Sequence, residues 1–121
     1  MNIEDFRNYC LSKVEVTECF PFDETTLVFK VMGKMFAITD TEDEFAIALK
    51  CDPEKVIQLR ERHHAVKPGY HLNKKYWNTI TIDGSINDGL LKEWIDHSYD
   101  EVVKTLPKKQ QILLASLIAS I

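Results

Sequence analysis

The sequence lacks the features that mark secreted, disulfide-bonded or membrane-spanning proteins. It has three cysteines, Cys10, Cys19 and Cys51, without a CxxC pair, and it has no repeat, low-complexity segment or linker. No stretch approaches the roughly 20 apolar residues that a membrane-spanning helix needs. Met1–Asp5 is acidic and has no basic region followed by an apolar one, so we expect no signal peptide. A cytoplasmic protein with reduced, mostly buried thiols and no membrane contact is the simplest expectation.

The sequence also lacks an excess of basic residues, but its charges are unevenly distributed. The net charge is −4, with 12 acids against 7 bases in residues 1–60 and 7 acids against 8 bases in residues 61–121. Within Arg60–Lys75 there are five bases and one acid, Glu61, together with three of the four histidines. Strong general nucleic-acid binders are usually basic overall. The sequence therefore indicates an acidic protein with one local basic surface.

Apolar periodicity predicts a single α+β domain over residues 1–121, because helical and strand-like patterns alternate along the whole chain. The expected arrangement has two layers: a mainly antiparallel five-stranded sheet, with helices on one face in the order α-β-β-β-α-β-β-α. The expected segments are a helix capped by Asn2, a loop over 19–25, strands over 26–31, 35–39 and 45–50, a helix begun by Asp52-Pro53-Glu54, a hairpin over 65–82, a helix over 86–106 and an apolar helical tail over 108–121.

The hairpin over 65–82 concentrates the most informative residues. Pro68-Gly69 breaks the chain, and Asn73-Lys74-Lys75 are residue types expected in a tight turn before a strand. From Tyr76 to Ile82 the side chains alternate between two faces, with Asn78 on one of them and Trp77 on the other. A β-hairpin with a cationic tip is predicted.

Four stretches resemble the MmcQ/YjbR family of small DNA-binding-like proteins, over essentially residues 3 to 109. The resemblance implies an α/β fold shared with frataxin-like and type III secretion chaperone-like proteins, and a double-wing mode in which two hairpins touch DNA. Two features depart from the family: Tyr76 stands where a histidine often precedes the tryptophan, and an apolar tail follows Lys109. The stretches that carry the resemblance are Thr26–Val31 with Gly33–Ala37, Leu49–Pro53, Pro68–Lys75 with Trp77–Thr79, and Ser98–Asp100 with Leu106–Lys109.

On the double-wing interpretation, lysines at the two hairpin tips lie against phosphates as mobile point charges. Tyr70 would stack on unpaired bases, and His71, Asn73 and Asn78 would hydrogen-bond to the backbone or to base edges. The alternative is also open: these are solvated turn residues, and the aromatics pack within the protein. The candidate nucleic-acid-binding residues are Lys34, Arg62, Lys67, Tyr70, His71, Asn73, Lys74, Lys75 and Asn78.

A second function from another class is a protein-interaction or chaperone-like module. It would use the sheet face or the apolar C-terminal helix, with Leu113–Ile121 as a surface for a protein partner or for self-association. We expect no enzyme, cofactor or metal. His63, His64 and His71 follow no metal-ligand spacing, and the chain has no Gly-rich phosphate cradle or nucleophile elbow.

Overall fold

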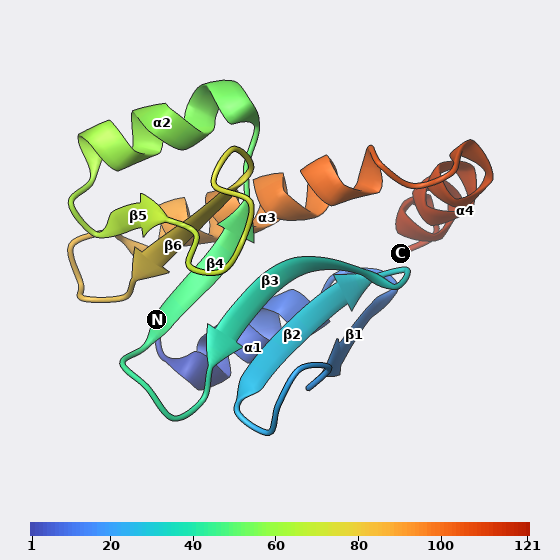
Figure 1. Ribbon diagram of the computed structural model, residues 1–121. Coiled ribbons are helices and arrows are strands. Elements are labelled where there is room, and N and C mark those ends of the chain that lie inside the picture. Colours follow the sequence, from blue (N-terminus) through green and yellow to red (C-terminus); the bar gives the residue numbers. More distant parts are fainter.

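A sheet of six antiparallel strands in the order β1-β2-β3-β4-β6-β5 forms the frame of the protein (Figure 1). The computed structural model describes residues 1–121. It confirms the predicted α+β class and the mainly antiparallel sheet, but the predicted count of five strands is wrong by one. The elements are α1 (Ile3–Leu11), β1 (Val16–Cys19), β2 (Thr26–Val31), β3 (Lys34–Asp40), β4 (Ala46–Lys50), α2 (Pro53–Arg62), β5 (Val66–Pro68), β6 (Trp77–Thr81), α3 (Asp88–Val103) and α4 (Lys108–Ala119).

The strand that the sequence analysis missed is β1. It is an edge strand of four residues that pairs only with β2, with Val16 opposite Val31 and Cys19 opposite Val28. None of its residues is fully buried. A short, half-exposed edge strand carries little apolar alternation, so periodicity alone does not reveal it.

The helices α1, α2 and α3 cover one face of the sheet. Phe29, Leu49 and Ile80 point to that face and belong to one core cluster, which α1 joins through Phe6 and α3 through Ile95. The Phe6 and Phe29 rings meet edge to face with centroids 5.5 Å apart. Figure 1 shows α1 and α3 behind the sheet, with α2 beside β5 and β6. The other face of the sheet is the open face.

Side-chain caps begin the first three helices where the sequence places them. Asn2 Oδ1 accepts a hydrogen bond from the Asp5 amide at 2.8 Å, and Asp52 Oδ1 accepts one from the Glu54 amide at 2.8 Å. Asn87 Oδ1 accepts one from the Leu90 amide at 2.8 Å. Each bond satisfies an amide that has no partner inside its helix.

The apolar tail forms the separate helix α4, which lies at the far end of α3 (Figure 1). Leu114 is its one buried residue and joins the core cluster beside Leu106. Ile112, Leu113 and Ile118 are 62%, 53% and 47% exposed. No helix has the length and apolarity needed to cross a membrane.

Ser98 fastens α3 to two strands at once. Its side chain is completely buried, and its Oγ accepts a hydrogen bond from the Lys50 amide at 2.8 Å while donating one to the Phe36 carbonyl at 2.5 Å. One hydroxyl thus satisfies a backbone donor of β4 and a backbone acceptor of β3. A small polar residue is required here because a larger one would not fit between helix and sheet.

We predict that Ser98→Ala lowers the free energy of unfolding by about 1–3 kcal/mol, because two buried backbone groups lose their partner. Chemical denaturation monitored by circular dichroism measures the change. Ser116→Ala, on the exposed surface of α4, is the matched control and should change stability by less than about 0.5 kcal/mol. Equal stability of the two variants would contradict the role given to Ser98.

Candidate nucleic-acid interface

The predicted hairpin consists of β5, β6 and a connection longer than one turn, the β5–β6 loop (residues 69–76). The predicted tight turn at Asn73-Lys74-Lys75 is confirmed and forms the last part of this loop, directly before β6. The side chain of Arg60 on α2 attaches this loop to the helix. Its Nε donates to Asn78 Oδ1 at 2.7 Å, and its Nη2 donates to the carbonyls of Trp77, at 3.3 Å, and Lys74. The loop is therefore fixed to α2 by a charged, partly buried side chain.

The interpretation of Asn78 as a surface contact to DNA is wrong. Its side chain is only 1% exposed, on the face covered by α2. Its Oδ1 accepts from Arg60, and its Nδ2 donates to the Val56 carbonyl at 3.1 Å. Both ends of the amide are used inside the protein, so Asn78 joins β6 to α2.

Asn73 and Gly69 shape the loop. Asn73 Oδ1 accepts a hydrogen bond from the Lys75 amide at 3.0 Å, and its carbonyl accepts from the amides of Tyr76 and Trp77 at 3.1 and 3.0 Å. A Cβ on Gly69 would lie 2.9 Å from the Cβ of Trp77, so the close approach of the two strands requires glycine there. Asn73 thus acts as a turn residue, with only its amide nitrogen left free for other contacts.

Two lysines, Lys50 and Lys75, lie over the Tyr76 ring, and Lys74 is next to Lys75 in the chain; we call Lys50, Lys74 and Lys75 the lysine cluster. Lys50 Nζ and Lys75 Nζ lie 5.7 and 5.5 Å from the Tyr76 ring centroid, and Lys74 Nζ lies 3.5 Å from the Gly69 carbonyl oxygen. None of the three forms an ion pair. Sequence reasoning missed Lys50, although its position at the end of a predicted strand was available as a signal.

Three other candidates lie apart from the lysine cluster. Lys34 is exposed at the same end of the sheet, but its Nζ donates to the Thr105 carbonyl at 3.1 Å, where α3 gives way to α4. Arg62 belongs to the last turn of α2 and lines a cavity between α2 and α3. Lys67 is exposed on β5, the edge strand. The predicted basic residues are therefore not all on one surface.

Tyr70 and His71 border the open face. Their rings contact each other at a centroid distance of 4.0 Å with their planes tilted by 48°, and Tyr70 is 77% exposed. They line a hollow of about 620 Å³ over β3, β4 and β6, whose apolar floor includes Ile38 and Ala48. The charged residues that line this hollow are carboxylic acids, so its surface does not attract phosphates. They are Asp23, Asp40, Asp43 and Glu44.

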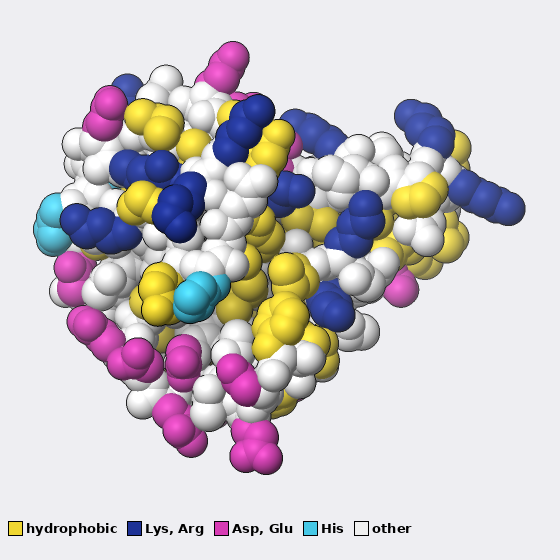
Figure 2. All heavy atoms as spheres, viewed as in Figure 1, with side chains coloured by type: hydrophobic (Ala, Val, Ile, Leu, Met, Phe, Trp, Pro, Cys, Tyr) yellow, Lys and Arg dark blue, Asp and Glu magenta, His cyan; other side chains and the backbone are white.

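Acidic and basic side chains separate along the strand direction. The basic end is where β3 begins, β4 ends and β6 begins, and it carries Lys34 and the lysine cluster. The acidic end is where β2 begins and β3 ends, at the Thr26–Asp40 pair. Figure 2 shows Lys and Arg over the β5–β6 loop and toward α4, most Asp and Glu along the opposite edge, and a few acids over α2. Hydrogen bonds from the Thr26 and Thr25 amides lower the pKa of Asp23, which keeps that carboxylate charged.

The buried thiols are protonated at neutral pH. Burial raises the pKa of Cys10 to about 12 and that of Cys51 to about 11. All three cysteines are free, as expected, and Cys19 is partly exposed. Because the thiolate is the nucleophile, neither buried thiol is activated.

Comparisons with known proteins identify relatives along almost the whole chain. A model of the YjbR family matches residues 11–101. The uncharacterized protein YjbR of Escherichia coli K12 is 34% identical over 118 residues, covering 97% of this chain and 100% of that protein. The uncharacterized protein YbdF of Escherichia coli O157:H7 is 36% identical over 94 residues, covering 77% of each chain.

Two solved structures share the fold. The crystal structure of Deinococcus radiodurans protein DR2400 superimposes with a TM-score of 0.88 at 40% identity, covering 94% of this chain and 88% of that one. A crystal structure of a protein from Pseudomonas syringae gives a TM-score of 0.70 at 25% identity, covering 81% and 96%.

We predict that Arg60→Met lowers the free energy of unfolding by about 1–3 kcal/mol, because Asn78 Oδ1 loses its partner in a buried position. The amides of residues 69–76 should also exchange faster with deuterium, since the loop loses its attachment to α2. Arg62→Met is the control, because Arg62 is exposed on the same helix and makes no side-chain hydrogen bond. If both variants behave alike, the Arg60 contacts do not hold the loop.

Proposed function

The chain belongs to the YjbR family, and we propose that it is a non-enzymatic DNA-binding protein whose basic end lies against the phosphate backbone. The observation that carries the proposal is the separation of charge along the sheet. With a net charge of −4, the protein as a whole is repelled by DNA. Because one end of the sheet is positive and the other negative, however, the electric field of DNA orients the protein. The basic end would face the duplex, with the acidic end turned away.

The lysine cluster is suited to phosphate contact. Its ammonium groups have no carboxylate partners, so approach to a phosphate breaks no ion pair. Two of them lie over the ring of Tyr76, and Arg60 attaches the β5–β6 loop to α2. Little ordering of the backbone is then needed on binding, which favours affinity.

The contact surface we propose is smaller than in the double-wing interpretation, in which both hairpin tips contact DNA equally. Lys34 Nζ lies 3.1 Å from the Thr105 carbonyl, a closer contact than the 3.5 Å between Lys74 Nζ and the Gly69 carbonyl, and Lys50 and Lys75 make no such bond. The β5–β6 loop with Lys50 therefore provides the main contact. Lysines recognise phosphates as point charges and carry no base specificity. About three neutralised phosphates give a slope of log affinity against log salt of roughly −3, hence weak binding that salt readily abolishes.

A second candidate function is self-association through α4. The side chains of Ile112, Leu113 and Ile118 on this helix are 47% to 62% exposed, and Leu114 is its one buried residue. Exposed apolar side chains grouped on one helix are typical of protein interfaces. A second copy of the chain would cover this surface by placing its own α4 against it, which brings identical apolar residues together in a symmetric contact.

We predict that the wild-type protein binds a fluorescein-labelled 20-bp duplex at low salt with a Kd in the tens of micromolar or below, measured by fluorescence anisotropy. Lys74→Glu combined with Lys75→Glu should weaken binding at least about tenfold, because two phosphate contacts become repulsive. Lys108→Glu combined with Lys109→Glu changes the net charge equally at the start of α4 and should weaken it far less. No wild-type binding, or equal losses in the two variants, would refute the proposed interface.

We predict a rise in molecular mass with concentration for the wild-type protein, measured by light scattering from about 10 to 500 μM. Leu113→Lys should hold the protein as a monomer, because it places a charge in the apolar surface. Ile57→Lys, on α2 at 48% exposure, makes the same change elsewhere and should leave the association intact. A wild-type protein that stays monomeric over this range excludes α4 as a self-association surface.

A further inference from the structure

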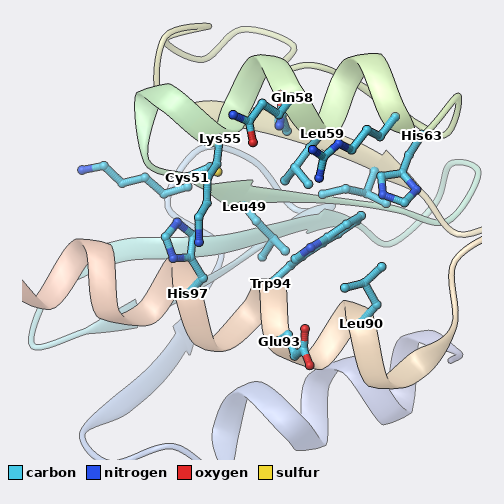
Figure 3. Close-up of a pocket in the computed structure, with 14 residues that line it drawn as sticks. Leu49, Cys51, Lys55, Gln58, Leu59, His63, Leu90, Glu93, Trp94 and His97 are labelled. Atoms are coloured by element: carbon cyan, nitrogen blue, oxygen red, sulfur yellow. The ribbon is translucent and has the colours of Figure 1, made fainter.

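A second concave surface lies between α2 and α3, on the helix-covered side of β4 and β6. Its volume is about 390 Å³, within the range of small-molecule sites. Leu49 of β4 and Ile80 of β6 form a buried floor, and Leu59 and Leu90 form the walls. Figure 3 shows these walls facing each other from α2 and α3. Helices held apart in this way leave a preformed space beside the core.

Trp94 gives this cavity a flat aromatic surface. Figure 3 shows its indole reaching from α3 across the cavity toward His63, the residue that follows α2, and the two rings meet edge to face with centroids 5.1 Å apart. The side chain is only partly buried. The cavity therefore offers a planar guest both a ring to stack on and an aliphatic floor.

The charged side chains that line the cavity give it a net positive charge. Lys55 and Arg62 are seven residues apart, close to two helical turns, so both project from the same side of α2. Neither forms an ion pair or a side-chain hydrogen bond, and Glu93 is the one carboxylic acid among the lining residues. Lys50 also lines the cavity, but its ammonium lies beside Tyr76.

Two carboxylates close to His97, which Lys55 also approaches, already have partners. Asp52 caps α2 through the Glu54 amide, and Glu101 forms an ion pair with Lys104 at 3.1 Å. His97, next to Lys55 in Figure 3, accepts a hydrogen bond from the Asp52 amide at its Nε2, 3.1 Å away. Burial lowers the pKa of His97, so the ring is neutral at pH 7 and carries its proton on Nδ1. Lys55 is left as the unpaired cation at this end of the cavity.

We propose that this cavity binds a small planar aromatic anion, with its ring against Trp94 and its carboxylate or phosphate at Lys55. The apolar floor and the indole favour the ring, and the unpaired ammonium favours the anionic group. Arg62 lies at the opposite end and holds a second polar substituent of the guest. Glu93 would repel a negative charge placed beside it.

The proposal is tested by titrating the full chain with 2-naphthoate, 2-naphthyl phosphate and the neutral 2-naphthylmethanol, followed by ¹H–¹⁵N NMR. We expect at least one anionic probe to bind with a Kd of about 0.1–1 mM and to shift the Trp94 indole N–H and amides of α2. The neutral probe should bind at least about fivefold more weakly. The tighter of the two anions identifies the preferred group.

Lys55→Gln should weaken binding of the anionic probe at least about fivefold and leave the neutral probe unchanged. Lys92→Gln is the matched control, since Lys92 lies on α3 with its ammonium 5.3 Å from the Tyr9 ring. A dispersed NMR spectrum shows that each variant is folded. The proposal is overturned if neither anion binds below about 5 mM, or if binding is indifferent to the charge of the probe and to Lys55. Because no DNA is present, this result is independent of the DNA-binding test.

Discussion

The hydrogen bond between Arg60 and Asn78 is the contact on which the rest of the proposed interface depends. Asn78 is buried beneath α2 and uses its other amide end on the Val56 carbonyl, so β6 and α2 cannot shift independently. The same guanidinium holds the carbonyls of Lys74 and Trp77. One side chain thereby fixes a helix, a strand and the loop that carries two of the three clustered lysines.

The antiparallel sheet separates basic from acidic side chains over the length of the molecule. Because β4 ends where β6 begins, Lys50 and the lysines of the β5–β6 loop meet, although they are far apart along the chain. The acids near Asp40 gather at the other end of the same strands, where β2 pairs with β3. An acidic protein thus acquires a basic end with no excess of basic residues, and the helix layer adds a separate positive cavity.

Local signals in the sequence predicted much of the fold and only part of the interface. The caps Asn2 and Asp52 and the strand periods were predictable because they depend on near neighbours. The alternation of β6 gave the face of Asn78 correctly but not the helix that covers it, and so a buried residue was read as a surface contact. Lys50 was missed, and Arg62 was grouped with the loop. The surface on which each of these residues lies depends on which elements pack side by side in space, and near neighbours in the sequence do not reveal that.

The most direct test of the account is a map of ¹H–¹⁵N chemical-shift changes on the full chain when a short DNA duplex is added at low salt. We expect the largest changes at Lys50 and across residues 69–77, little change at the acidic end around Asp40–Glu44, and reversal of all changes on adding salt. Changes centred on the acidic end or on α4, or changes that salt does not reverse, would contradict the claim that the basic end carries the function.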